Sequence, residues 1–140
     1  MSQFILDEQL AASDVLVPLQ ETLKVRRLTD LRPKEQILDD RVPEILLALK
    51  GPTFITIDQD FWDRYLCHPG YCILYFYLRD QDQDRLPELL RALLRLPEFR
   101  TRASRLGKVV RVRAARIDFW QHQVPELQHV SWPKTPRRRP

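Results

Sequence analysis

Acidic residues follow two predicted β-strands of this 140-residue chain, at the point where each strand ends. Asp7 comes directly after the apolar residues 4–6, and Asp58 and Asp60 come after the β-branched, apolar run 53–57. In an open parallel sheet, ligands bind outside the carboxyl ends of the strands. If these two strands are neighbours, the carboxylates that follow them converge. The sequence then predicts an acidic site at the edge of the sheet formed by the carboxyl ends of the strands.

A third acid is expected at the same edge, from the helix that leads into the second of these strands. Asp40 stands where the N-cap of that helix belongs, and the chain from there to residue 57 is long enough for a helix and a strand running in opposite directions. Asp39 and Glu44 remain alternatives for this position, and Glu8 is a possible additional acid.

The chemistry expected of these acids is metal binding. Several carboxylates in one place cannot all be ionised without a cation, and hard oxygen ligands at this density suit Mg²⁺ or Mn²⁺. Such an ion can activate a water molecule and stabilise in-line displacement at a phosphate. Each acid also precedes a predicted helix, where a carboxylate that caps free N–H groups contributes about 0.5–2 kcal/mol. Capping is therefore the alternative role of each acid taken singly.

The elements that must position these acids alternate between short apolar runs and helical patterns. This alternation is typical of strand–helix units around a parallel sheet, so the predicted fold class is α/β. We expect strands over residues 4–6, 23–28, 53–57, 71–78 and 108–117, and helices over residues 9–23, 40–49, 61–66 and 85–96.

Positive charge is concentrated in the second half of the chain. Residues 1–84 carry 9 basic and 15 acidic side chains, for a net charge of −6, whereas residues 85–140 carry 14 and 4, for +10. The alternation of Val and Arg from residue 108 predicts a strand with one solvated basic face. An alternative to mere solvation is phosphate binding, for which the candidates are Arg102, Arg105, Lys108, Arg111 and Arg113.

Composition excludes several classes of protein. The longest strongly apolar stretch, residues 71–78, is far short of the ~20 residues that span a bilayer, so no membrane association is expected. The N-terminus lacks the basic region of a signal peptide, and two cysteines do not make a disulfide framework, so we expect a cytoplasmic protein. Only three glycines are present, which argues against a Gly-rich phosphate loop.

Several short motifs, in order and spacing, resemble the PIN-like (PilT N-terminus-like) nuclease superfamily. They are Ile5-Leu6-Asp7-Glu8, Asp40 ahead of Ile45-Leu46, Ile55-Thr56-Ile57-Asp58-Gln59-Asp60-Phe61, and His68-Pro69-Gly70 before an apolar strand. The chain is most similar to the small stand-alone bacterial group, whose signature reads Leu-Asp-Glu-Asn near the start and Asp-x-Asp-Phe in the middle. The similarity covers about residues 3–78, and Gln9 replaces the usual Asn of the first motif.

The resemblance implies a three-layer α/β/α sandwich with a mainly parallel central sheet and a metal-dependent endoribonuclease activity. By position, Asp7, Asp40, Asp58 and Asp60 are the implied metal-binding and catalytic acids. Many relatives are toxins of type II toxin–antitoxin pairs. RNA, a cognate antitoxin and a second copy of the chain are therefore the implied partners.

The predicted organisation is a PIN-like domain over residues 1–120 and a C-terminal extension over residues 121–140 that ends in a basic, partly disordered tail. The predicted function is hydrolysis of RNA at a carboxylate-bound Mg²⁺ or Mn²⁺. The alternative is a catalytically inactive module on the same fold that binds nucleic acid or protein.

Overall fold

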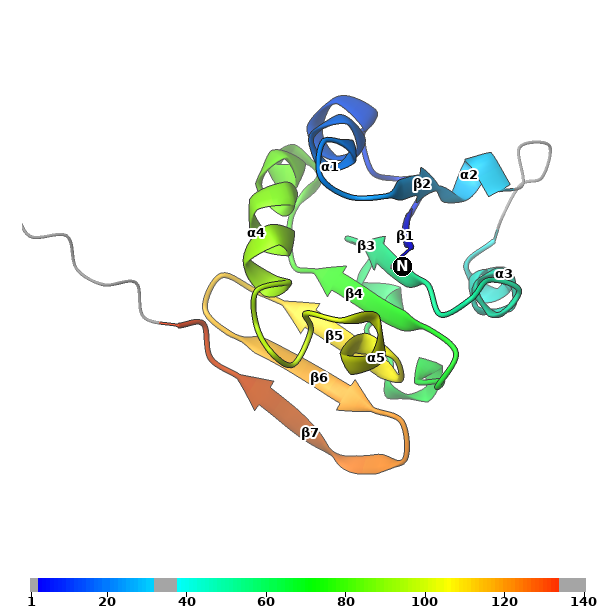
Figure 1. Ribbon diagram of the computed structural model, residues 1–140, viewed down its shortest axis with the longest axis vertical. Helices are drawn as coiled ribbons and strands as arrows, with labels where there is room; N and C mark the ends of the chain where they lie inside the picture. Colours follow the sequence, from blue (N-terminus) through cyan, green and yellow to red (C-terminus); the bar gives the residue numbers. More distant parts are fainter. Residues whose placement is uncertain (1–2, 32–37, 134–140) are drawn as a thin grey trace, which may run out of the picture.

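Seven strands form one sheet in the computed structural model, which describes residues 3–31 and 38–133. The strands are β1 (Phe4–Leu6), β2 (Val25–Arg27), β3 (Thr53–Thr56), β4 (Cys72–Phe76), β5 (Lys108–Val112), β6 (Ile117–Gln121) and β7 (Val124–Val130). Their spatial order is β2-β1-β3-β4-β5-β6-β7, from the top to the bottom of Figure 1. β1 and β3 are therefore neighbours, as the predicted acidic site requires.

Parallel and antiparallel pairing divide the sheet. β1 pairs in parallel with β2 and β3, and the β3–β4 and β4–β5 pairs are also parallel. β6 and β7 are added in antiparallel fashion. The ends of β1 to β5 consequently lie at one edge of the sheet, which we call the carboxyl edge, together with the start of β6 and the end of β7. The opposite edge is called the amino edge.

Short helical segments connect the strands. They are η1 (Ala12–Leu16), α1 (Val17–Gln20), α2 (Leu28–Leu31), η2 (Asp39–Arg41), α3 (Val42–Leu47), η3 (Gln59–Phe61), η4 (Arg64–Leu66), η5 (Asp80–Arg85), α4 (Leu86–Leu93) and α5 (Arg102–Arg105). Prolines stand in the first turns of α1, α3 and α4, where a missing N–H costs no hydrogen bond.

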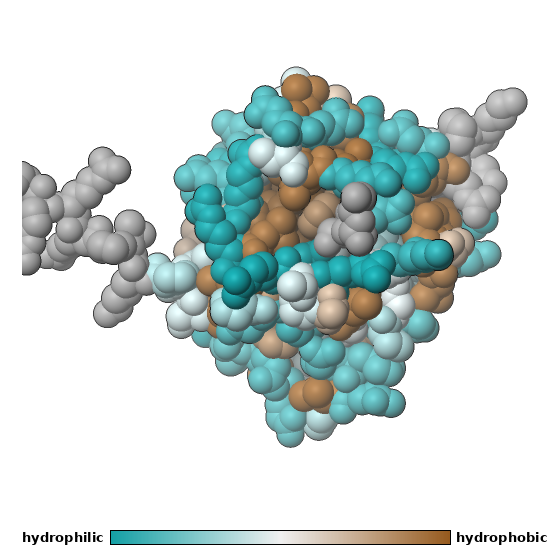
Figure 2. All heavy atoms as spheres, in the orientation of Figure 1, coloured by the Kyte–Doolittle hydropathy of each residue, from teal (hydrophilic) through white to brown (hydrophobic). Residues whose placement is uncertain are grey.

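Apolar side chains form two cores because successive residues of a strand point to opposite faces of the sheet. Ile55 of β3 packs with α1 and α4, whereas Phe54 packs with α3 on the other face. The leucines of α4 recur at helical spacing, which buries Leu86, Leu90 and Leu93 along one stripe. On the face seen in Figure 2, hydrophilic residues cover most of the surface and hydrophobic residues gather towards its centre.

Helices pack on both faces of the seven-stranded sheet. The predicted α/β class is therefore confirmed.

The predicted strand over residues 108–117 is wrong as a single element. β5 ends at Val112, and the chain turns back to begin β6 at Ile117, with the Arg113 N–H donating to the Arg116 carbonyl at 3.1 Å. The turn brings Asp118 opposite Arg111 in the antiparallel register. A basic strand therefore acquires an acidic partner that its own sequence does not contain.

The sheet continues beyond residue 120, where the predicted domain ended. β7 pairs with β6 and completes the sheet within the predicted extension. The basic tail over residues 134–140 lies outside the described residues. Over the part of the chain that the structure describes, none of the helices has the length and apolar character needed to cross a membrane.

Candidate metal centre

Parallel pairing of β1 and β3 brings the acids that follow them together at the carboxyl edge. Leu6 lies opposite Ile55, and the Asp7 N–H continues the ladder by donating to the Ile55 carbonyl at 2.9 Å. Asp58 follows β3 by two residues and caps η3, since its Oδ1 accepts from the Asp60 N–H at 2.9 Å. The predicted convergence of these strand ends is present.

Asp7 is a buried carboxylate, with a side chain that is 4% exposed. Burial raises its pKa from 3.8 to about 6, and the negative charges of Asp39 and Asp58 act in the same direction. Hydrogen bonds from the Thr56 hydroxyl and the Glu8 N–H lower the pKa and partly offset this effect. Asp7 is therefore an acid held in a position that disfavours its charge.

Three other carboxylates form a close group that does not include Asp7, although Asp39 and Asp58 are near enough to raise its pKa. Asp39, Asp58 and Asp60 each offer one oxygen, and these oxygens all lie within 4.8 Å of one another. The pKa of Asp39 is raised by desolvation and then by the charge and hydrogen bonding of Asp58. We call Asp39, Asp58 and Asp60 the acidic cluster.

The acid contributed by the helix before β3 is Asp39. Asp40 and Glu44 do not belong to the group of close carboxylates found among the described residues. η2 and α3 run from the carboxyl edge back to the start of β3, so the first residue of this helical segment lies nearest the other acids. Glu8 is close enough to raise the pKa of Asp39 but is also outside the cluster.

Thr56 connects the two acid-bearing strands, and the sequence prediction did not include it. Its hydroxyl donates to Asp7 Oδ2 at 2.7 Å and accepts from the Asp58 N–H at 3.0 Å. Thr56 is fully buried. The available signal was a hydroxyl-bearing residue at the end of a buried strand, two residues before Asp58.

The acidic cluster could hold a metal ion, and its carboxylate oxygens are the kind of ligand that Mg²⁺ and Mn²⁺ prefer. Mg²⁺ binds oxygen at about 2.1 Å, so two oxygens on opposite sides of one ion lie roughly 4.2 Å apart. A spread of 4.8 Å places the three cluster oxygens within a small movement of that arrangement. A bound cation would also relieve the repulsion that raises the pKa of Asp39.

Three of the predicted phosphate-binding residues lie at the amino edge, away from the acidic cluster. Arg105 is 1% exposed, and its guanidinium donates to Thr53 Oγ1 at 3.0 Å and to the Phe99 carbonyl at 2.9 Å. Lys108 donates to the Glu98 carbonyl at 2.8 Å, and Arg102 donates to the Lys50 carbonyl at 3.2 Å. These contacts hold α5 and the start of β5 in place, and a phosphate has no access to the buried Arg105.

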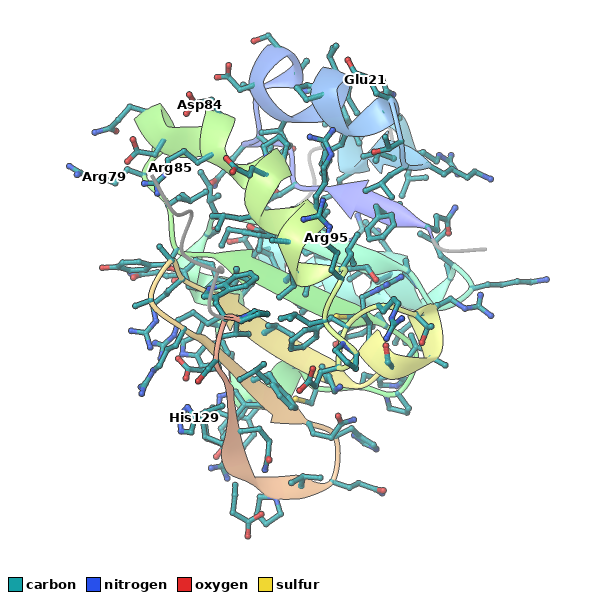
Figure 3. The ribbon with its side chains drawn as sticks, turned by 60° about the vertical axis from the view of Figure 1, so that its left-hand side comes forward. Glu21, Arg79, Asp84, Arg85, Arg95 and His129 are labelled. Atoms are coloured by element: carbon teal, nitrogen blue, oxygen red, sulfur yellow. The ribbon has the colours of Figure 1, made fainter. Side chains whose placement is uncertain are left out.

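The other two, Arg111 and Arg113, lie towards the carboxyl edge and bind a buried acid. They donate to Asp118 Oδ2 at 2.8 and 2.7 Å, and the Asp118 side chain is 0% exposed. Arg116 and His129 contact the other oxygen at 3.2 and 2.6 Å. His129 is labelled on β7 in Figure 3. We call these five residues the arginine cluster.

Asp118 has the opposite electrostatic environment to Asp7. Burial by itself would raise the pKa of Asp118, but hydrogen bonds from Arg111 and His129 and the positive charges of Arg111 and Arg113 outweigh it and lower the pKa. Three arginines share this single carboxylate. The arginine cluster therefore keeps an excess of positive charge on the same edge of the sheet as the acidic cluster.

No protein-family model matches this chain, and comparison with curated proteins and with solved structures likewise finds no match.

Proposed function

We propose that this chain is a metal-dependent endoribonuclease with a PIN-like three-layer fold. The observation that carries the proposal is the convergence of Asp39, Asp58 and Asp60 within 4.8 Å, beside the buried Asp7. Helices on both faces of a sheet with five successive parallel strands agree with that fold. The toxin role, the antitoxin and the dimer rest on the sequence resemblance alone.

A divalent cation in the acidic cluster would supply an activated water and stabilise the charge that develops on a phosphodiester. The protein's part is to hold the ligands in place. Thr56 fixes Asp7 and the Asp58 backbone with one hydroxyl, and Asp58 fixes the Asp60 backbone. These hydrogen bonds connect Asp7, Asp58 and Asp60 to the rigid sheet, which is the support that a metal centre needs.

The positive charge of the arginine cluster is complementary to the negative charge of RNA. Arg111, Arg113 and Arg116 present three positive charges against one carboxylate at the edge where the acids lie. The excess positive charge can hold phosphates that flank the one being cleaved. The free cysteines Cys67 and Cys72 agree with the reducing cytoplasm that the sequence predicts.

The test compares Asp58→Asn with Asp63→Asn in Mn²⁺-dependent cleavage of unpaired RNA. Both aspartates cap a 3-10 helix, and each side chain accepts from a backbone N–H at 2.9 Å. Only Asp58 belongs to the acidic cluster. Asp58→Asn should lower the cleavage rate by about 100-fold or more, because a metal ligand is lost, whereas Asp63→Asn should cleave like the wild type.

Equal cleavage by the two variants and the wild type would contradict the proposal. RNA binding without any metal-dependent cleavage by the wild type would instead favour the alternative, a catalytically inactive binding module on the same fold.

A further inference from the structure

A cavity lies next to the acidic cluster at the carboxyl edge. Its volume is about 550 Å³, within the range of ~300–1,000 Å³ typical of ligand pockets. Ile57 and Gln59, which line it, are the two chain neighbours of Asp58. The remaining lining residues come from the end of β4 and from the segment that follows it: Tyr75, Tyr77, Leu78, Arg79, Asp82 and Arg85.

The lining combines an aromatic surface with positive charge. Tyr77 is 64% exposed although it directly follows the buried strand β4, so most of its surface is free for contact. Ile57 and Leu78 add apolar surface beside it. Exposed tyrosine rings provide stacking platforms for unpaired bases.

Two arginines supply the positive charge. Arg79 and Arg85 stand at either end of the turn that η5 makes, and Figure 3 labels both at the same corner of the molecule. Arg79 forms one long ion pair, with Asp82 at 3.7 Å, and its side chain is 80% exposed. Within the described part of the chain, Arg85 has no ion pair. The lining residues therefore carry two positive charges and one negative charge.

We propose that this cavity is a nucleotide subsite of the ribonuclease. It holds one unpaired nucleotide next to the phosphate at the acidic cluster, with the base against Tyr77 and a flanking phosphate between Arg79 and Arg85. This inference rests on the proposed function, because it places the nucleotide next to the phosphate that the acidic cluster would cleave. It adds that the substrate is unpaired at this position, because a base inside a duplex cannot stack on a protein ring.

The test measures binding without cleavage. A fluorescein-labelled oligouridylate of about ten nucleotides is titrated with the full chain in EDTA, and fluorescence anisotropy gives the dissociation constant. The pocket variants are Tyr77→Ala and the double variant Arg79→Gln with Arg85→Gln. The control is Arg95→Gln with Arg100→Gln, which removes two exposed arginines after α4, where the chain has returned to the amino edge.

Each pocket variant should weaken binding by about tenfold, and the control should change it little. A duplex of the same length should bind in a way that Tyr77→Ala does not affect. Equal weakening by the two double variants would mean that only overall charge matters, and unchanged binding by the pocket variants would also overturn the subsite. Since no divalent ion is present, the outcome is independent of whether the wild type cleaves RNA.

Discussion

Two buried aspartates, Asp7 and Asp118, lie at the same edge of one sheet in opposite electrostatic environments. Asp7 is buried near the carboxylates of the acidic cluster, and its pKa is raised to about 6. Asp118 is buried among three arginines and a histidine, and its pKa is lowered. The two buried aspartates therefore differ in the sign of the charge around them, and their pKa values shift in opposite directions.

The difference indicates which of the two sites could hold a metal ion. The charge of Asp118 is more than balanced by its own neighbours, so this carboxylate organises the ends of β5, β6 and β7. The charges of Asp39 and Asp58 add to the rise in the pKa of Asp7, and a divalent cation held by the acidic cluster would offset them. Removing one charge from each site should therefore have opposite consequences for stability.

Asp118→Asn should change the free energy of unfolding more than the other substitutions considered below. The substitution leaves Arg111, Arg113 and Arg116 without their shared anion. We expect the free energy of unfolding at pH 7 to fall by about 3 kcal/mol, the low end for breaking a buried ion pair, because the arginines are partly exposed. Urea unfolding of the two proteins measures the difference.

The pH dependence of this loss has a definite sign. Because the folded pKa of Asp118 is lowered, its contribution to stability is present above the ordinary value of 3.8 and disappears as the pH falls through the folded pKa. The difference between wild type and Asp118→Asn should therefore shrink in acid. A difference that stayed constant to the lowest accessible pH would be inconsistent with a charged Asp118.

Asp7→Asn should have the opposite effect in EDTA. The variant removes a buried charge, and the Asn carbonyl oxygen can still accept from the Thr56 hydroxyl. We expect the free energy of unfolding at pH 8 to rise by about 2 kcal/mol. Since the folded pKa of about 6 lies above 3.8, the Asp7 contribution falls as the pH rises from about 4 to about 6 and is constant above that.

Unfolding curves of the wild type and Asp7→Asn at pH 4 and pH 8 measure this change in stability. The two proteins should be nearly equal in stability at pH 4, where Asp7 is protonated in the folded chain. A destabilised Asp7→Asn protein at pH 8 would show that the charge of Asp7 is already balanced inside the molecule.

Thr56→Val should have the smallest effect. It removes the hydroxyl that donates to Asp7 and accepts from the Asp58 N–H, and we expect a loss of about 1 kcal/mol in the free energy of unfolding. Because the Thr56 hydrogen bond lowers the pKa of Asp7, the pH window of the Asp7 effect should also move upwards. Thr56→Ser keeps the hydroxyl and should retain both properties.

The acids at the strand ends were predictable because they depend on local patterns. The β-branched run 53–57 identifies β3. Asp7 directly follows β1 and Asp58 follows β3 by two residues, and the sheet makes these two strands neighbours. The choice between Asp39 and Asp40 was not predictable, because adjacent residues of a helical turn point in different directions and helix boundaries vary by one or two residues.

The partners of the basic residues could not be predicted, for a different reason. Arg105 and Arg111 resemble solvated residues in sequence, but their partners are fixed by tertiary packing. Thr53 is 52 residues from Arg105, and Asp118 reaches Arg111 only through a turn that has no Gly, Asn or Asp to mark it. A basic run is therefore weak evidence of a phosphate-binding surface until the acids that face it are known.

Titration of the full chain with Mn²⁺, followed by electron paramagnetic resonance of the free ion, tests the central claim most directly. We expect a saturable site in the wild type and in Asp63→Asn that is lost in Asp58→Asn, because of these two aspartates only Asp58 belongs to the acidic cluster. A wild-type protein without a saturable site, or one whose site survives in Asp58→Asn, would contradict it.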